Sequence, residues 1–356
     1  MVVRMRIDGM MRNVLTVPHG LQASVISRLK VMGAMNISER KVPQDGRANV
    51  RVKNSDIDLR ISTLPTIYGE KMVIRLLDKS TQILSRQGVG LEGQNLERYG
   101  QLMRSSSGVI LIAGPTGSGK SSTMYTMVRE LNTEQVNLVT LEDPVEYNID
   151  GVNQCQINEK TGMTFSNGLR AILRQDPDII AVGEIRDGET ASIAMRAAIT
   201  GHLVLSTIHT SDSIATLDRL VDIDVEPYLI ASALKGVVAQ RLVRRVCPNC
   251  KREYDPTDEE LELMHIPRTP GMKLYRGEGC PMCYHTGYRG RTGVFEVLLV
   301  DHAIRRLITR KAPREDVVAA AERGGFVSLA ENCRRLVLAG VTTTEEAVRT
   351  INSTLE

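Results

Sequence analysis

The sequence predicts an α/β protein in which a parallel β-sheet follows a smaller α+β unit. Three observations lead to this prediction. Between residues 108 and 245, short apolar runs alternate with segments of helical spacing, which is the pattern of a parallel sheet. Residues 1–84 instead hold several strand-like runs and one long helical segment. The chain has 356 residues, 42% of them hydrophobic, which is enough to bury a sizeable core.

The first unit, residues 1–84, is predicted to hold five strands and one helix. Asp8-Gly9 favours a hairpin turn between the first two strands. Leu21–Met32 has the apolar spacing of a helix and is followed by Gly33. The predicted strands are Val2–Ile7, Arg12–Val17, Ala48–Val52, Ile57–Ser62 and Lys71–Leu77.

The rest of the chain divides into four segments. Residues 85–107 are polar and glycine-containing, and they predict a linker with a short helix at Leu96–Arg104. Residues 108–245 form the sheet domain, residues 246–295 contain two cysteine pairs, and residues 296–356 predict short helices. The predicted strands of the sheet are Val109–Ala113, Asn137–Leu141, Ile179–Val182 and Leu203–Thr207.

Composition and charge exclude several classes of protein. No apolar run approaches the roughly 18 residues that a membrane span needs, and the N-terminus lacks the apolar core of a signal peptide. A net charge of +3 is too small to predict nucleic-acid binding, and an aromatic content of 3% offers few surfaces for stacking bases. Six cysteines do not form a disulfide scaffold in a chain of this length, so we infer a reducing compartment.

The strongest chemical signal is GPTGSGKS, which matches the phosphate-binding loop G-x-x-x-x-G-K-[ST] without a mismatch. A predicted strand precedes it, and a predicted helix, Ser121–Leu131, follows. Glycines let backbone N–H groups turn toward phosphate oxygens, and the helix N-terminus favours negative charge. Lys120 would lie beside the β- and γ-phosphates, and the Ser121 hydroxyl would ligate Mg²⁺. The predicted nucleotide-binding residues are Gly114, Pro115, Thr116, Gly117, Ser118, Gly119, Lys120, Ser121 and Ser122.

Two acidic residues are candidates for positioning an attacking water. Glu142 follows the apolar run in NLVTLED, and Glu184 ends DIIAVGE. Because ligands of an open parallel sheet bind beyond the carboxyl ends of its strands, both acids are expected at the nucleotide. Neither segment is an ordinary Walker B motif, since Gly183 stands where an aspartate is expected. The alternative is that each acid only caps the next helix.

His209 and several arginines are further candidates for contact with phosphate. His209 follows a third apolar strand, where an imidazole can hydrogen-bond the γ-phosphate, although a lone histidine is more often structural. A guanidinium near the γ-phosphate would stabilise transition-state charge, and the alternative is a salt-bridged surface. The arginines near strand ends are Arg47, Arg60, Arg75, Arg170, Arg174 and Arg186.

Two C-x-x-C pairs predict a structural zinc site, because four thiolates in two knuckles close a tetrahedral shell. The stretch between the pairs is long and is expected to contain an acidic helix, Thr257–Met264. Redox dithiols or idle thiols are the alternatives. Cys155 and Cys333 have no partner at ligand spacing and are interpreted as packing residues. The predicted metal ligands are Cys247, Cys250, Cys280 and Cys283.

The stretch Arg241–Arg252, RLVRRVCPNCKR, contains five basic residues and no acid. It is a candidate contact for nucleic acid, acidic lipid or an acidic partner. The alternative is a solvated face beside the cysteine pairs.

Five segments, in this order, resemble the secretion ATPases of type II secretion and type IV pilus assembly. They are GPTGSGKSST, LVTLEDPVEY, GLRAILRQDPDIIAVGEIRD, TGHLVLSTIHT and AQRLVRRVCPNC. The resemblance implies a RecA-like domain that uses ATP, Mg²⁺ and Zn²⁺, preceded by a PAS-like domain. It further implies a cytoplasmic homo-hexamer that docks on an inner-membrane platform protein, at the inner face of the cytoplasmic membrane, and that moves pilin-like subunits. Membrane association would come through partners, and no nucleic acid is expected.

The same resemblance implies roles for single residues. Glu142, in the Asp box, would support Mg²⁺ or the attacking water, and Glu184, in the atypical Walker B motif, would be the base. His209, in the His box, would face the γ-phosphate. Arg60 and Arg75 would reach phosphate from the mobile first domain. The three matched boxes are Leu138–Tyr147, Asp178–Asp187 and Gly201–Thr210. Arg170, Arg174 and Arg186 match positions near the nucleotide or at subunit contacts.

Two departures from the family pattern qualify this reading. The family's additional N-terminal docking domain is missing, and we expect the chain to begin inside a longer protein. The tetracysteine insert matches the assembly and secretion branches and argues against a retraction motor. Two alternatives stay open: a RecA-like motor that translocates nucleic acid, and a zinc-ribbon adaptor whose ATP site only regulates. DNA-stimulated turnover would favour the first, and ATP binding with negligible hydrolysis the second.

Overall fold

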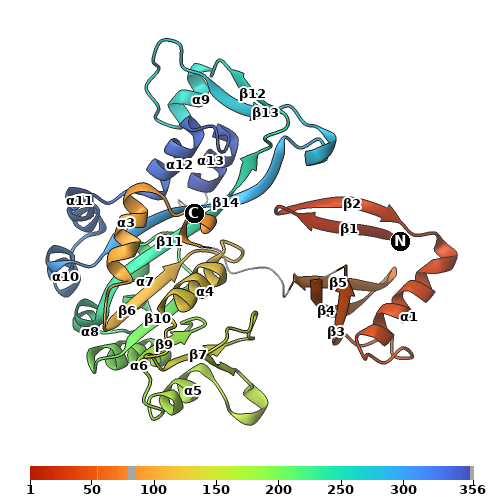
Figure 1. Ribbon diagram of the computed structural model, residues 1–356, viewed down its shortest axis with the longest axis horizontal. Helices are drawn as coiled ribbons and strands as arrows, with labels where there is room; N and C mark the ends of the chain where they lie inside the picture. Colours follow the sequence, from red (N-terminus) through yellow and green to blue (C-terminus); the bar gives the residue numbers. More distant parts are fainter. Residues whose placement is uncertain (54, 79–84, 353–356) are drawn as a thin grey trace. The chain divides into compact units, whose positions relative to one another are not determined.

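The computed structural model describes residues 1–53, 55–78 and 85–352, and the chain divides into two units, Met1–Gln82 and Ile83–Glu356 (Figure 1). The boundary that the sequence predicts at residue 84 lies outside the described residues. Within those described ranges, no helix is both long and apolar enough to cross a membrane.

The N-terminal unit contains two antiparallel sheets and a long helix. The predicted hairpin is confirmed: β1 pairs with β2, and Asp8 and Gly9 take the positive φ angles, 48° and 84°, that a tight hairpin turn needs. The second sheet has the order β3-β4-β5, and Leu59 and Ile61 are buried in its small core. The elements are β1 (Val2–Ile7), β2 (Met10–Thr16), η1 (His19–Leu21), α1 (Gln22–Met32), β3 (Gln44–Val52), β4 (Ser55–Thr66) and β5 (Gly69–Asp78).

A seven-stranded sheet forms the centre of the second unit, in the order β14-β11-β6-β10-β9-β7-β8 (Figure 1). Neighbouring strands are parallel, except that β14 runs antiparallel to β11. The predicted parallel sheet and its four predicted strands are confirmed, whereas β8, β11 and β14 were not predicted. The strands are β6 (Gly108–Ala113), β7 (Leu138–Glu142), β8 (Asn153–Gln156), β9 (Ile179–Val182), β10 (Leu203–Ile208), β11 (Leu234–Val246) and β14 (Tyr288–Leu299).

Helices cover both faces of this sheet, as the side chains of β6 demonstrate. Val109 and Leu111 pack into one core with α5–α8, α10 and α11, whereas Ile110 and Ile112 pack into a second core with α2–α4. Successive strand residues point to opposite faces, so a strand buried on both sides is continuously apolar. The helices are α2 (Arg86–Val89), α3 (Gly93–Leu102), α4 (Lys120–Leu131), α5 (Phe165–Ile172), α6 (Gly188–Ile199), α7 (Ala215–Asp222), α8 (Pro227–Ala233), α10 (His302–Thr309) and α11 (Arg314–Arg323), with the 3₁₀ turn η2 (Glu159–Thr161).

A third core joins the segment around the cysteines to the last two helices. Leu261 and Leu274 of this segment pack with Leu329, Val337 and Ala347. The predicted acidic helix is present as α9, with a capping box between Thr257 and Glu260. The elements are β12 (Lys251–Tyr254), α9 (Asp258–Leu263), β13 (Leu274–Gly277), η3 (Pro281–Cys283), α12 (Leu329–Leu338) and α13 (Thr344–Asn352).

Candidate functional site

The loop between β6 and α4 has the wrapped shape that its motif predicts. Gly114, Gly117 and Gly119 all have positive φ angles, of 152°, 78° and 91°. A Cβ on Gly114 would lie 2.5 Å from Ser118 Oγ and 2.6 Å from Gln240 O, so the close approach of the chain requires glycine. The loop therefore presents its backbone at the N-terminus of α4, where anions bind.

Lys120 lies inside this loop and has no acidic hydrogen-bond partner in the described chain. Its Nζ donates to Gly114 O at 2.7 Å and to Pro115 O at 3.1 Å, and the residue is only 8% exposed. Burial lowers the pKa of Lys120 to about 8; the charge of Glu184 opposes this shift and that of Arg241 adds to it. A phosphate at this position would satisfy the buried cation.

Two further polar atoms, one in the loop and one on the neighbouring strand β11, have no hydrogen-bond partner among the described residues. Ser118 Oγ and Gln240 Oε1 are buried and make no hydrogen bond among the described residues. The side chains of Ser121 and Ser122 are exposed in the first turn of α4. Buried polar groups normally have partners, so these atoms suit a polar ligand. The loop thus fits a nucleotide with its metal ion, and the unpredicted Gln240 adjoins it.

Glu184 and His209 meet at the ends of β9 and β10. His209 Nε2 lies 3.3 Å from Glu184 Oε2, and Arg186 pairs with Glu184 Oε1. Burial alone would raise the pKa of Glu184, but hydrogen bonds and charge from Arg186 and His209 lower it below its usual range. Because the charge of Glu184 also acts on Lys120, the carboxylate and the loop form one electrostatic group.

Gly183 occupies the position where an ordinary Walker B motif has an acid, and the packing explains it. A Cβ there would lie 3.2 Å from Leu141 O and 3.4 Å from the Cα of Glu142. Close approach of β7 and β9 therefore favours glycine, and the carboxylate comes one residue later, at Glu184.

Glu142 ends β7 and is only 3% exposed. Its Oε1 accepts from Thr140 Oγ1 at 2.5 Å and from Gln154 Nε2 at 3.0 Å, and its Oε2 accepts from the Tyr125 hydroxyl. Burial, together with this bond to Glu142, raises the pKa of Tyr125. Tyr125 and Gln154 were not predicted as partners of this acid, because no local pattern in the sequence shows that α4 and β8 reach it.

The predicted arginines fall into two groups. Arg60 and Arg75 belong to the N-terminal unit, where Arg47, Arg60 and Arg75 are directly opposite one another on β3, β4 and β5. In the second unit, Arg170 pairs with Glu189 at 2.9 Å, and Arg174 donates to the carbonyl of Arg170. Arg186 is the second-unit arginine that reaches a predicted catalytic acid.

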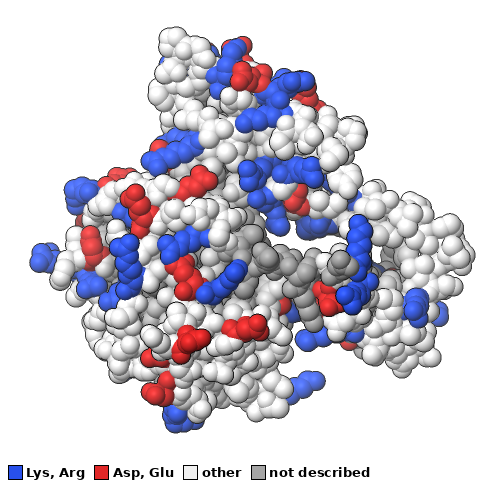
Figure 2. Space-filling view, in the orientation of Figure 1, with Lys and Arg blue, Asp and Glu red and all other residues white. Residues whose placement is uncertain are grey.

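The basic stretch is only partly the exposed face that the sequence suggested, since Arg245 and Arg252 are exposed but two other arginines are not. Arg241 and Arg244 lie in β11 and are buried, at 5% and 9% exposure. Arg244 Nη2 donates to Glu346 Oε1 at 2.6 Å, and Arg241 Nη2 donates to Ser211 O at 2.5 Å. Both the partner-binding and the solvated-face interpretations are therefore wrong for these two residues. On the face shown in Figure 2, basic and acidic side chains occur together over the second unit.

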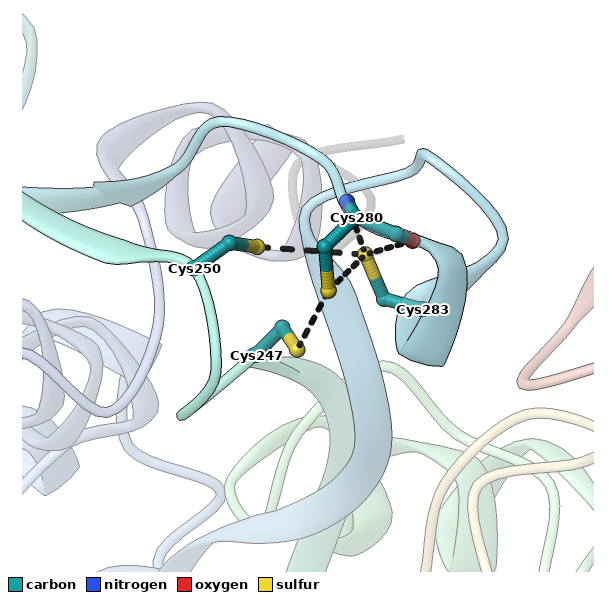
Figure 3. A group of neighbouring side chains, drawn as sticks. All are labelled: Cys247, Cys250, Cys280 and Cys283. Carbon is teal, nitrogen blue, oxygen red and sulfur yellow. Dashed lines mark hydrogen bonds between the residues drawn. The ribbon is translucent and has the colours of Figure 1, made fainter.

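The four predicted cysteines point toward one another (Figure 3). Their Sγ atoms all lie within 4.8 Å, with 3.9 Å between Cys247 and Cys280, 3.9 Å between Cys250 and Cys283, and 3.7 Å between Cys280 and Cys283. Disulfide sulfurs are about 2.05 Å apart, whereas tetrahedral Zn–S bonds of about 2.3 Å place sulfurs roughly 3.8 Å apart. The donor set therefore fits a four-coordinate zinc ion.

Backbone amides support this sulfur cluster. The N–H groups of Cys280 and Gly287 donate to Cys283 Sγ at 3.2 and 3.3 Å. Burial alone would raise the pKa of Cys283, but these donors lower it to about 6 and favour the thiolate that binds metal. Outside the cluster, Cys333 is buried in the third core and Cys155 is partly buried against the first, as expected of packing residues.

The chain belongs to the family of type II/IV secretion system proteins, whose family model matches residues 1–349. It is 46% identical to the type II secretion system ATPase E of Vibrio cholerae over 98% of this chain and 69% of that protein. It is 47% identical to the type IV pilus assembly ATPase PilB of Thermus thermophilus over 98% of this chain and 40% of that protein.

Solved structures agree with this assignment. The pilus retraction motor PilT with bound ADP superposes with a TM-score of 0.66 at 28% identity, covering 98% of this chain and 89% of that one. The chain is thus an ATP-hydrolysing enzyme of the secretion and pilus ATPase class rather than a nucleic-acid translocase. The PAS-like character of the first unit stays a prediction.

Proposed function

We propose that this ATPase drives the assembly of pilins or pseudopilins, as a homo-hexamer docked on an inner-membrane platform protein at the cytoplasmic face of the membrane. The names of the relatives and the cysteine insert support assembly or secretion over retraction. The observation that carries the catalytic proposal is the meeting of Glu184 and His209 at the ends of two adjacent parallel strands, beside the loop that holds Lys120.

In this proposal the reaction is phosphoryl transfer to water. Lys120 would exchange its carbonyl partners for phosphate oxygens, and the Ser121 hydroxyl would help to hold Mg²⁺, which would neutralise phosphate charge when bound. Glu184 takes or orients the water proton, since Arg186 and His209 keep its carboxylate ionised. His209 lies next to Glu184, where its ring can also contact the γ-phosphate.

Glu142 acts at the edge of the same site in this scheme. Its carboxylate is held by Tyr125, Thr140 and Gln154, so its position is fixed before a nucleotide binds. We assign to it the support of Mg²⁺ or of the attacking water.

Arg60 and Arg75 complete the proposed site as phosphate contacts from the N-terminal unit. Like charges that face each other on neighbouring strands are destabilising, and a bound anion would offset this cost in the Arg47–Arg60–Arg75 row. Contacts that form only when this unit closes on ATP would link the nucleotide state to the angle between the units.

We assign a structural role to zinc at the tetracysteine site. The four thiols leave no open ligand position among themselves, so the ion would stabilise the fold of the insert rather than act on substrate.

Steady-state release of phosphate from MgATP tests this proposal, at protein concentrations that populate oligomers and with and without DNA. We expect turnover that DNA does not change and that Lys120→Ala abolishes, since the variant lacks the buried cation. Lys160→Ala is the matched control, because Lys160 is exposed on the turn η2, and it should behave like the wild type. Strong stimulation by DNA, or normal turnover by Lys120→Ala, would refute the proposal.

A further inference from the structure

We propose that Glu296 positions His209 for ATP hydrolysis and ties the catalytic loop to the C-terminal helices. The His209 loop is defined as residues 209–214, between β10 and α7. This inference rests on the proposed catalytic role of His209. Glu296 is on β14, the strand at one edge of the sheet, whereas the strands that precede the predicted acids, β9 and β7, lie toward the other edge. No sequence motif pointed to Glu296.

Glu296 is a buried carboxylate with both oxygens in use. The residue is 4% exposed. Its Oε1 accepts from the backbone N–H and the hydroxyl of Ser213, both at 2.7 Å, and its Oε2 accepts from Leu329 N–H at 2.9 Å. Ser213 lies in the His209 loop and Leu329 is the first residue of α12. One side chain therefore bridges the loop and the start of a C-terminal helix.

The hydrogen-bond partners of Glu296 require a carboxylate at this position. Burying an acid is costly unless it is hydrogen-bonded, and burial raises the pKa of Glu296. All its partners are donors, so only a side chain that accepts at both oxygens satisfies them. An amide offers one acceptor, and an apolar residue offers none. A packing role alone would not need this group.

The rest of the His209 loop is held in the same way. Arg241 of β11 donates to Ser211 O at 2.5 Å, and Arg314 of α11 donates to Asp212 Oδ2 at 2.8 Å. His209, by contrast, is 49% exposed and has Glu184 beside it. These bonds thus hold the backbone of the His209 loop in place and leave the imidazole of His209 accessible. A displacement of about 1 Å in such a scaffold can cost a hundredfold in rate.

A double-mutant cycle tests this inference on the full chain. Glu296→Gln keeps one acceptor oxygen and turns the other into a donor. We expect it to lower kcat about tenfold or more, with KM for ATP unchanged within about twofold, because the hydrogen bonds of Glu296 go to Ser213 and Leu329 and not to the phosphate loop. If Glu296 acts through His209, the same change in a His209→Ala background should lower kcat by less than about twofold.

Ser328→Ala is the matched control. Ser328 caps α12 by accepting from Glu331 N–H at 3.2 Å and forms no hydrogen bond with the His209 loop in the described chain, so its loss should lower the melting temperature but leave kcat unchanged. Ser213→Ala is the second variant in case Glu296→Gln does not fold. It keeps the N–H bond, and its smaller loss of kcat should also vanish in the His209→Ala background.

The possible outcomes separate the two proposals. Equal losses from Glu296→Gln in both backgrounds, normal kcat in Glu296→Gln, or a parallel loss of kcat in Ser328→Ala would overturn the positioning role. Wild-type turnover by His209→Ala would instead refute the catalytic role of His209. If Glu296→Gln does not fold in either background, normal kcat in Ser213→Ala overturns the inference on its own.

Discussion

The nucleotide loop and the cysteine cluster belong to the same unit, but their side chains are partnered in opposite ways. At the loop, Lys120 has only carbonyl partners, Ser118 Oγ has none among the described residues, and His209 is half exposed. In the cluster, the sulfurs face one another and backbone amides cap Cys283. A site built for a reaction keeps positions for its substrate, whereas a structural site closes on itself.

The largest test of this difference removes one cysteine. Cys250→Ser should reduce the free energy of unfolding by about 3 kcal/mol or more, because a closed metal site contributes directly to folding. Metal content and thermal melting measure the effect, and turnover well below the melting point should change little. Cys155→Ser, outside the cluster, is the control. A variant that melts normally and keeps its metal would contradict the closed-site interpretation.

The next test removes the proposed base from the open site. Glu184→Gln should lower kcat about a hundredfold or more while ATP still binds, because the amide cannot accept the water proton. Glu189→Gln, an exposed acid paired with Arg170, is the matched control. Phosphate release and binding of a non-hydrolysable analogue measure both quantities. Equal turnover in the two variants would exclude Glu184 as the base.

A third test measures how much the hydrogen bonds around the buried Glu142 stabilise the fold. Tyr125→Phe deletes one donor to this buried carboxylate and the acceptor of the Glu146 and Tyr147 N–H groups, so it should cost about 2 kcal/mol of stability or more. Tyr228→Phe, on the surface of α8, should cost less than about 0.5 kcal/mol. Chemical denaturation gives both values. Equal costs would show that the bond to Glu142 contributes nothing to the fold.

The smallest effect concerns pH. Arg186 helps to lower the pKa of Glu184, so Arg186→Gln should raise that pKa and move the acid limb of the kcat profile to higher pH. The groups that face Glu184 are Arg186, His209 and Lys120. Arg252→Gln, in an exposed pair with Glu278, should leave the profile unchanged. An unmoved acid limb in Arg186→Gln would mean that the ionisation of Glu184 does not control it.

Local pattern predicted the parts of the fold that are local. The parallel sheet, the phosphate loop and the two cysteine knuckles follow from strand runs and fixed spacings. What the sequence could not provide were contacts between distant segments. Arg244 looked like a surface charge in the sequence, but α13 packs against β11 and brings Glu346, 102 residues away, to its guanidinium. Glu296 and Tyr125 were missed for the same reason, since their partners lie on other elements.

The shared core of the cysteine segment and the last two helices has a consequence for synthesis. Leu261 packs against residues as late as Ala347, so this body cannot close before Ala347 has been made. The strands from β6 to β10 are complete more than a hundred residues earlier and can begin to fold from the ribosome. We therefore expect the sheet around the nucleotide loop to begin folding before the segment that holds the metal-binding thiols has its C-terminal helices to pack against.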